Sequence, residues 1–282
     1  MSNVVGQNDN LLNRLERDLP EGLLVTSGWF RQHGYSRQLV SHYLSSGRLE
    51  QPARGVYRKP RGTLSWQQAV ISLQTILLDD PLYVGGRTAL ELQGYAHYLR
   101  QKTQAVHLYS KQPLPGWLAK LPLDVRFVRR NSLRLFKNDP ITYGLSSLKF
   151  DVARNSGTRN DRGLTYRPWG HWDWPLTLST PERAILELLD ELPDHESFHQ
   201  VDMLMDGLVD LSPRRLAKLL ADCHSIKVKR LFFFFADRHR HAWRRHLKKK
   251  DVDLGSGKRL LVKGGKLDPT YLITVPEAMN GV

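Results

Sequence analysis

The stretch SGWFRQHGYSRQLVSHYLSSGRLEQPARGVYRKPR, residues 27–61, has the spacing of two short helices followed by two short strands. Ser27 can cap the first helix, and Gly34 supplies the left-handed residue that lets the chain turn. Ser36 can cap the second helix, which Gly47 ends. The apolar stripe of this second helix consists of Leu39, Val40, Tyr43 and Leu44.

The end of the same stretch predicts a β-hairpin. Residues 49–51 and 56–58 are short enough for two strands, and the Pro52-Ala53-Arg54-Gly55 sequence between them favours a tight turn. A helix that stops at Pro20 is predicted upstream by the repeat of Leu11, Leu12, Leu15 and Leu19. Three helices followed by a hairpin indicate a winged helix-turn-helix, in which the hairpin is the wing.

The polar side chains of this unit suit DNA. The second helix carries, away from its apolar stripe, Arg37, Gln38, Ser41, His42 and Ser45, which can hydrogen-bond base edges and phosphates. The wing carries Arg54, Arg58, Lys59 and Arg61, where a DNA backbone would pass. An alternative interpretation is a helical hairpin with a β-turn that packs against the rest of the protein and exposes ordinary basic residues.

The charge of the chain favours a polyanionic partner. Its 282 residues carry a net charge of +14, with a pI near 10.0. Residues 1–62 account for +4 and residues 212–266 for +13, so the remainder carries −3. The larger basic excess therefore lies in the C-terminal third.

Composition also limits the class of protein. Cys223 is the only cysteine, so an internal disulfide and a multi-cysteine zinc site are excluded and a reducing compartment fits. The first residues, MSNVVGQNDN, lack a signal-peptide pattern, and no apolar run approaches the roughly 20 residues of a membrane span. We expect a cytoplasmic protein of about two domains, without membrane contact and without cofactors.

The middle of the chain alternates between helix and strand patterns. An amphipathic helix is expected from Trp66, and a brief strand at residues 82–84 precedes one short helix in GGRTALELQG. Residues 106–108, 123–127 and 148–152 alternate as half-buried strands do, and residues 154–163 are expected to form a loop. Trp169, Trp172 and Trp174 near His171 could stack on unpaired bases, although such clusters are more often core.

Helices dominate from Ser179 onward. Three helical patterns precede the longest one, expected at residues 226–247, whose LFFFF run predicts a buried seam. Its Lys229, Arg230, Arg240, Arg244 and Arg245 are expected to face solvent or a partner. The closing GSGKRLLVKGGKLDPTYLITV predicts a β-hairpin that turns at Gly264-Gly265.

Catalytic motifs are sparse. His195-Glu196-Ser197-Phe198-His199 has the H-E-x-x-H spacing of two zinc ligands, but Pro193 and Asp194 place His195 at a helix end, so we expect exposed imidazoles and no metal site. The GSGK sequence at 255–258 lacks the rest of a phosphate-binding loop. No acid precedes a lysine by two positions, as metal-assisted nucleases usually require. A non-enzymatic protein is expected; the alternative is a nucleic-acid-binding or nucleic-acid-processing enzyme whose active site is not recognised.

Three ordered blocks carry a family resemblance. LLVTSGWFRQHGYSRQLVSHYLSSGRLEQPARGVYRKP, LSWQQAVISLQ and VGGRTALELQGYAHYL, within residues 10–99, resemble the N-terminal domain of AbiEi-family antitoxins, transcriptional regulators of type IV toxin-antitoxin systems. VKRLFFFFADRH and KRLLVKGGKLDPTYLITVP resemble the antitoxin domain more loosely. The resemblance implies an α+β protein. Its N-terminal DNA-binding domain would span residues 1–95, with the winged helix-turn-helix at about 10–61 plus a helical extension, and a larger mixed α/β antitoxin domain would span residues 96–282.

The resemblance also implies a function and partners. The chain would bind inverted repeats in double-stranded operator DNA, repress its own operon and self-associate at least on DNA. It would counter a cognate nucleotidyltransferase-type toxin, with or without a stable complex, in a system of phage defence. The hypothesis for the antitoxin surface comprises Lys229, Arg230, Arg240, Arg244, Arg245, Lys258 and Lys263, which would occupy RNA or DNA that the toxin also uses. A solvated surface and additional nonspecific DNA contacts remain as alternatives.

Overall fold

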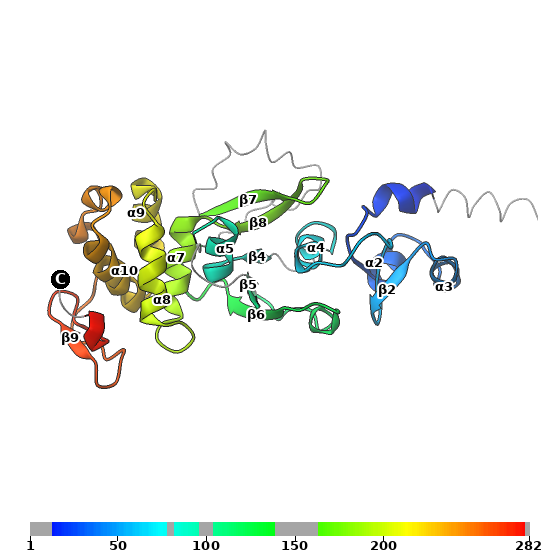
Figure 1. The fold of residues 1–282 in the computed structure, drawn as a ribbon. Coiled ribbons are helices and arrows are strands. Elements are labelled where there is room, and N and C mark those ends of the chain that lie inside the picture. The colour runs from blue at the N-terminus through cyan, green and yellow to red at the C-terminus, as the bar shows by residue number, and fades with distance from the viewer. Residues whose placement is uncertain (1–12, 78–81, 96–103, 139–162, 280–282) are drawn as a thin grey trace, which may run out of the picture.

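A computed structural model of the chain describes residues 13–77, 82–95, 104–138 and 163–279 (Figure 1). The N-terminal part, residues 13–61, which we call the winged unit, lies at one end of an elongated molecule. A mixed sheet lies in the middle, and a group of helices with a small hairpin forms the other end (Figure 1). The combination of helices with mixed sheets confirms the predicted α+β class. Among the described residues, no helix is both long enough and apolar enough to cross a membrane.

The N-terminal unit has the predicted order of elements. Residues 13–18 are helical and precede β1 (Val25–Thr26), α2 (Ser27–Gln32), α3 (Arg37–Ser45), β2 (Glu50–Ala53) and β3 (Val56–Arg58). The three strands form an antiparallel sheet in the order β1-β3-β2. The cap of α2 differs from the prediction, because the side chain of Thr26, and not that of Ser27, accepts the Trp29 N–H at 3.3 Å.

A separate cluster of buried side chains forms the core of this unit. Its members come from all three helices, from β1 and from the connections between the elements: Leu15, Leu19, Val25, Trp29, Phe30, Tyr35, Leu39, Val40, Tyr43 and Leu49. Leu39, Val40 and Tyr43 of the predicted stripe are buried on α3, so the opposite face of that helix is left to solvent. The core thereby determines which face of α3 is available to a partner.

A Ser36→Ala chain is expected to lose about 1 kcal/mol of stability. Ser36 is the N-cap of α3, and its Oγ accepts the Leu39 N–H at 3.2 Å, a hydrogen bond that alanine removes. Chemical denaturation would measure the change, with Ser41→Ala, an exposed position inside the same helix, as the control. Equal stability of the two variants would contradict the role of the cap.

The central sheet combines segments from both sides of residue 95. Its strands are β4 (Leu82–Val84), β5 (Ala105–Ser110), β6 (Arg126–Asn131), β7 (Leu164–Trp169) and β8 (Trp174–Ser179), in the order β6-β5-β4-β8-β7. The strand β4 pairs antiparallel with β5 and parallel with β8. Because β4 is the middle strand, the packing of this sheet crosses the domain boundary suggested by the sequence.

Helices α4 (Trp66–Ser72), which continues as a π-helical turn Leu73–Leu77, and α5 (Gly86–Leu92) belong to the same packed body. The second predicted strand of the middle region begins at Arg126, later than expected, after a 3-10 helix Leu118–Lys120. The expected strand at 148–152 and the expected loop at 154–162 lie outside the described residues.

The C-terminal helices are α7 (Pro181–Asp190), α8 (Phe198–Gly207), α9 (Pro213–Asp222) and α10 (Ile226–His239). The LFFFF run on α10 is buried, as predicted. The helix ends at His239, however, and not at residue 247, because Arg240 adopts a left-handed conformation with φ 52°. Two 3-10 helices, Ala242–His246 and Lys249–Asp251, follow it.

The predicted C-terminal hairpin exists, but its turn was misplaced. Its strands are β9 (Lys266–Asp268) and β10 (Ile273–Val275), so the turn spans residues 269–272 and Gly264-Gly265 precedes the first strand. The Asp268 carboxylate accepts the Tyr271 N–H at 2.6 Å, which stabilises the tight turn that follows Asp268. A short 3-10 helix, Glu277–Met279, follows the hairpin.

Candidate nucleic-acid interface

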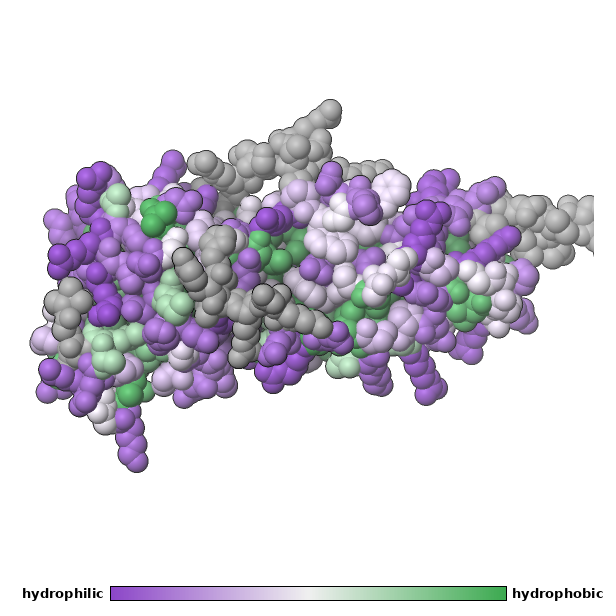
Figure 2. All heavy atoms as spheres, viewed as in Figure 1, coloured by the Kyte–Doolittle hydropathy of each residue, from purple (hydrophilic) through white to green (hydrophobic). Residues whose placement is uncertain are grey.

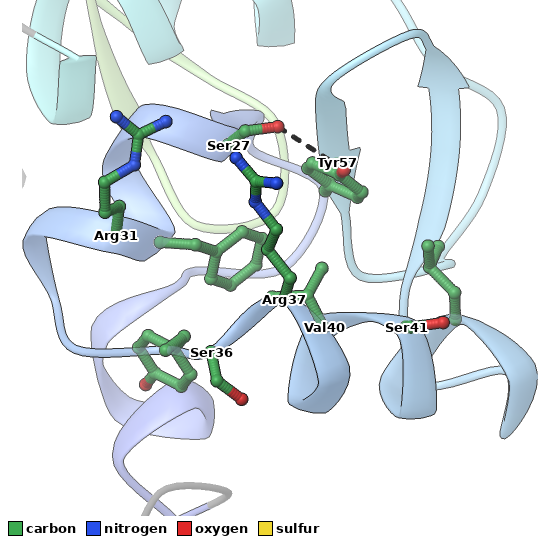
Figure 3. Close-up of a pocket in the computed structure, with 10 residues that line it drawn as sticks. Ser27, Arg31, Ser36, Arg37, Val40, Ser41 and Tyr57 are labelled. Carbon is green, nitrogen blue, oxygen red and sulfur yellow. Dashed lines mark hydrogen bonds between the residues drawn. The ribbon is translucent and has the colours of Figure 1, made fainter.

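A groove of about 710 Å³ opens on the winged unit between α2, α3 and β3 (Figure 3). We call it the α2–α3 groove. It is lined by Ser27, Phe30, Arg31, Tyr35, Ser36, Arg37, Val40, Ser41, Leu44 and Tyr57. Both helices of the helix-turn-helix and the strand that follows the wing turn therefore contribute to one concave surface.

The floor of the groove is apolar and its rim is cationic and hydroxylic. Phe30, Tyr35 and Val40 are buried, and burial raises the pKa of Tyr35 to about 12, so this phenol stays neutral at physiological pH. Arg31 and Arg37 are exposed, and their guanidinium groups extend to the same side in the close-up view (Figure 3). Two cations above an apolar floor suit an anionic ligand.

Within the described part of the chain, neither arginine on this rim has a carboxylate partner. No described carboxylate lies within ion-pair distance of Arg31 or Arg37. A guanidinium carries five donors in a planar fork that matches phosphate oxygens and the acceptor edge of guanine. The rim can therefore supply charge-assisted hydrogen bonds to a nucleic acid.

The wing turn is held against the start of α2. The Ser27 N–H donates to the Gly55 carbonyl at 2.9 Å, and the Ser27 Oγ lies 3.4 Å from the Tyr57 hydroxyl (Figure 3). Gly55 has φ 75°, the left-handed conformation that the turn needs. These contacts fix the position of the wing relative to the groove.

All five residues predicted for the DNA-facing side of the second helix are exposed on α3, namely Arg37, Gln38, Ser41, His42 and Ser45. Arg37 and Ser41 also line the groove, whereas Gln38, His42 and Ser45 lie outside it. The Ser45 Oγ donates to the His42 carbonyl at 3.0 Å. The sequence therefore identified one exposed polar face, and the structure adds the groove along its edge.

The predicted residues of the wing divide into two groups. Arg54 is exposed in the turn between β2 and β3, and Arg61 is exposed although its Nη1 lies 3.0 Å from the Glu21 carboxylate. Arg58 and Lys59, in contrast, are buried, with 4% and 6% of their surface exposed. The structure thus contradicts the placement of Arg58 and Lys59 on the DNA-facing side of the wing.

Internal partners explain the burial of these two cations. Arg58 pairs with the Glu50 carboxylate and donates to the Gly62 carbonyl at 2.6 Å. The Lys59 Nζ lies 2.6 Å from the Glu16 carboxylate and 3.0 Å from the Glu16 carbonyl oxygen. Both residues join the wing to neighbouring segments, so their role in the fold is structural.

Arg31 is a candidate that the sequence analysis missed. It lies on α2, the first helix of the pair, and no spacing rule in the sequence marks it as a DNA contact. The signal in the sequence was a basic residue directly after the large apolar residues Trp29 and Phe30, which are buried in the structure. Only the packing of α2 against α3 shows that Arg31 and Arg37 share a groove.

The predicted C-terminal surface also needs correction. Lys229 and Arg230 are buried, with 6% and 2% of their surface exposed, because α10 is enclosed on nearly all sides. Arg244 is half-buried and its Nε lies 2.6 Å from the Asp237 carboxylate. The remaining members of the predicted set are exposed: Arg240, Arg245, Lys258 and Lys263.

The zinc-like spacing at 195–199 does not form one helical face. The helix α8 begins at Phe198, so His195 precedes it and His199 lies in its first turn, and both imidazoles are exposed. Glu196, which would be the base of such a site, is buried and pairs with Arg87. Within the described residues, no three His, Cys, Asp or Glu side chains are arranged to hold a metal ion.

Two further sequence features have structural roles. Cys223 is buried, and burial raises the pKa of its thiol to about 11, so it is not a reactive thiolate. The tryptophans of the β7–β8 hairpin differ in burial: Trp174 is buried in the main core, whereas Trp172 is exposed. They do not form one stacking platform.

Two protein-family models match consecutive parts of the chain. A family model described as the AbiEi antitoxin N-terminal domain of a transcriptional regulator matches residues 8–101. A second one, described as a transcriptional regulator, AbiEi antitoxin of a type IV toxin-antitoxin system, matches residues 103–276.

The fold is also similar to that of a solved structure, the crystal structure of the RV2827C protein from Mycobacterium tuberculosis. The TM-score is 0.57 at 18% sequence identity, over 93% of this chain and 89% of that one. None of the curated proteins compared with the chain matches it. Because the two family models together extend over nearly the whole chain, it belongs to the AbiEi antitoxins, transcriptional regulators of type IV toxin-antitoxin systems.

Proposed function

We propose that this chain binds operator DNA through its winged unit, represses its own operon and neutralises a cognate nucleotidyltransferase-type toxin. The observation that supports DNA binding is the exposed polar face of α3 beside the α2–α3 groove, whose two arginines form no ion pair with a described carboxylate. The membership in a family of regulators and antitoxins supports the pairing of the two activities in one chain. We infer that both activities depend on binding and involve no catalysis.

In this proposal α3 enters the major groove. The side chains that face base edges and neighbouring phosphates are those on the face of α3 opposite its buried stripe: Arg37, Gln38, Ser41, His42 and Ser45. Arg54 and Arg61 contact the flanking backbone from the wing side.

Arg31 extends the contact to the phosphates on the α2 side of the groove, next to Arg37. Phosphate contacts fix the orientation of the protein on the duplex and the base contacts specify the sequence. This division predicts that substitutions of Arg31 weaken binding to all duplexes alike.

Inverted repeats in the operator would be read by two copies of the chain related by a two-fold axis. Half-sites would then be about 34 Å apart or a multiple of that distance, because each α3 needs the same face of the double helix. Self-association on DNA follows from this arrangement.

We assign toxin antagonism to the larger C-terminal part, proposed as residues 96–282. This part holds the predicted antitoxin surface, of which Arg240, Arg245, Lys258 and Lys263 are exposed. Because the central sheet includes β4, which lies before residue 95, the two activities are better separated by substitutions in the full chain than by truncation.

A full-length Arg37→Ala/Arg54→Ala chain is expected to lose repression of its own promoter and to retain rescue of toxin-producing cells. Both side chains are exposed and lack carboxylate partners among the described residues, so the fold should be unchanged. A promoter-reporter assay and growth of cells that carry the neighbouring toxin gene would measure the two outcomes.

The matched control is Arg126→Ala/Arg167→Ala, which removes two exposed arginines from the central sheet. This control should keep both activities. Retained repression in the Arg37→Ala/Arg54→Ala chain would refute the placement of DNA, and loss of rescue in that chain would refute the separation of the two activities.

A further inference from the structure

Exposed cations gather at the end of the molecule opposite the winged unit. We call this set the C-terminal basic surface; its members are Arg240, Arg245, Lys248, Lys250, Lys258, Arg259, Lys263 and Lys266. No described carboxylate forms an ion pair with any of these eight side chains. The exposed acids between residues 240 and 266 are Asp251 and Asp253, so the surface has a large excess of positive charge.

Two chain segments that form this surface are joined by a polar junction. The Asp237 carboxylate, at the end of α10, accepts from the Arg244 Nε at 2.6 Å and from the Tyr271 hydroxyl. The Lys249 Nζ lies 4.4 Å from the centre of the Tyr271 ring. The 3-10 helices after α10 and the β9–β10 hairpin therefore pack together, so both segments carry their exposed cations at the same end of the molecule (Figure 1).

The loop that leads into Lys258 is fixed from below by a buried cation. The Arg230 Nε donates to the Leu254 carbonyl at 2.7 Å, and its Nη1 donates to the Gly257 carbonyl at 2.7 Å and to the Leu272 carbonyl at 3.3 Å. Arg230 thus joins α10, this loop and the hairpin turn. Although it was expected on the surface, it instead orders the segment that carries the surface.

The backbone after this loop is also held in place. The Arg259 N–H donates to the Leu272 carbonyl at 2.8 Å, and the Thr274 N–H donates to the Arg259 carbonyl at 3.0 Å. The Leu261 and Val262 N–H groups both donate to the Thr274 Oγ1, at 2.7 and 2.9 Å. The exposed Lys258, Arg259 and Lys263 side chains therefore extend from an ordered backbone, unlike those of a solvated tail.

We propose that the C-terminal basic surface binds the phosphate backbone of a nucleic acid, independently of sequence and separately from the winged unit. Its cations are spread over residues 240–250, which include the two 3-10 helices, and over residues 258–266, which lead into β9; this spread suits an extended polyanion better than one small anion. Hydrophilic side chains cover much of this end of the molecule (Figure 2). Phosphate contacts of this kind carry no sequence information.

The C-terminal basic surface lies far from the winged unit (Figure 1), so it can bind a nucleic acid independently of that unit. Helices α2 and α3, which line the groove, lie at one end of the elongated chain, whereas the segments after α10 that carry the C-terminal basic surface lie at the other end (Figure 1). One molecule therefore has two separate cationic sites. A short duplex can bind to one of them without contacting the other. The proposal for the C-terminal surface does not depend on operator binding by α3.

The test uses the full chain carrying Arg37→Ala and Arg54→Ala, so that the winged unit contributes less to the signal. In this background, Lys258→Gln/Arg259→Gln/Lys263→Gln is compared with Lys120→Gln/Arg126→Gln/Lys137→Gln, which removes the same number of exposed lysines and arginines from the central region. The probes are a DNA duplex of unrelated sequence and an RNA hairpin, each long enough for about two helical turns.

The C-terminal triple variant is expected to bind at least one probe about tenfold or more weakly than the control variant. The slope of log K against log salt should also fall by about two to three, since each lost phosphate contact on a duplex removes about 0.9. Comparison of the two probes shows whether the surface prefers DNA or RNA.

Two results would overturn the proposal. One is equal affinity of the two triple variants for both probes, which would make the effect one of net charge alone. The other is absence of binding to either probe at low salt, which would exclude nucleic acid as the partner of this surface. Circular dichroism of both triple variants would verify that the exposed substitutions leave the fold intact.

Discussion

A Glu187→Ala chain is expected to lose about 3–5 kcal/mol of stability, because it removes a buried carboxylate that pairs with the buried Arg183 guanidinium and accepts several hydrogen bonds. The Glu187 carboxylate is fully buried on α7 and accepts from the Arg183 Nε at 2.9 Å. It also accepts from the Ser179 Oγ at 2.8 Å, the Gly86 N–H at 2.9 Å and the Tyr83 hydroxyl at 3.1 Å. The side chain therefore joins α7 to β8, α5 and β4.

Burial is the main influence on this group. Desolvation raises the pKa of Glu187, and the nearby Arg183 opposes that rise. The Arg183 guanidinium is itself buried, donates to the Tyr83 hydroxyl at 3.0 Å and lies 4.0 Å from the centre of the Phe136 ring. Removal of the carboxylate takes away the ion pair that Glu187 forms with this buried charge, whereas replacing both partners by apolar residues would cost much less.

Urea denaturation of the full chain would measure the effect. The control is Glu277→Ala, which removes an exposed carboxylate near the C-terminus and should change stability by less than about 0.5 kcal/mol. An Arg183→Met/Glu187→Leu chain should recover part of the loss. A change below about 1 kcal/mol for Glu187→Ala would show that the network does not stabilise the junction of helices and sheet.

An Arg37→Ala chain is expected to lose about 1–3 kcal/mol of operator affinity if Arg37 donates to a guanine. The loss would then disappear for an operator that carries another base at that position. If Arg37 binds a phosphate, the affinity for every duplex should instead fall by a similar factor, and the salt slope should fall by about one.

Binding of the unchanged and the variant chain to a set of operators with single base changes would separate these cases. Arg126→Ala is the matched control, because Arg126 is exposed on β6, outside the winged unit. Unchanged affinity for all operators after Arg37→Ala would remove Arg37 from the interface.

The local features of the winged unit were predictable because they depend on neighbouring residues. The apolar stripe of α3, its Ser36 cap and the glycine turns follow from spacings of a few positions. The same spacings determine which polar residues of α3 stay exposed. The core of the candidate interface could therefore be identified without the structure.

The burial of particular cations was not predictable, because their partners are remote in the sequence. Lys59 is buried by Glu16, which lies 43 residues earlier. Arg230 is satisfied by carbonyl groups 24 to 42 residues later, and carbonyls leave no pattern in a sequence. A basic residue on a helix was therefore expected at the surface, whereas a long-range backbone contact holds it in the core.

The pairing of strands in the central sheet was not predictable either, because the paired segments are remote in the sequence. The strand β4 is only three residues long, and its parallel partner, β8, lies beyond the residues that the structure leaves undescribed at 139–162. Parallel pairing of distant segments depends on the packed helices around it, which no local pattern reports. The end of α10 at Arg240 is similar, since neither glycine nor proline marks it.

The most direct test of the proposed DNA interface is the affinity of the full chain for the DNA upstream of its own gene, before and after Arg37→Ala/Arg54→Ala. Fluorescence anisotropy at fixed salt would measure it, with Arg126→Ala/Arg167→Ala as the control. Loss of an Arg37 base contact of about 1–3 kcal/mol should by itself weaken binding by roughly fivefold or more, and loss of the Arg54 phosphate contact should weaken it further, while the control binds as the unchanged chain does. Equal affinity of the two double variants would contradict the interface.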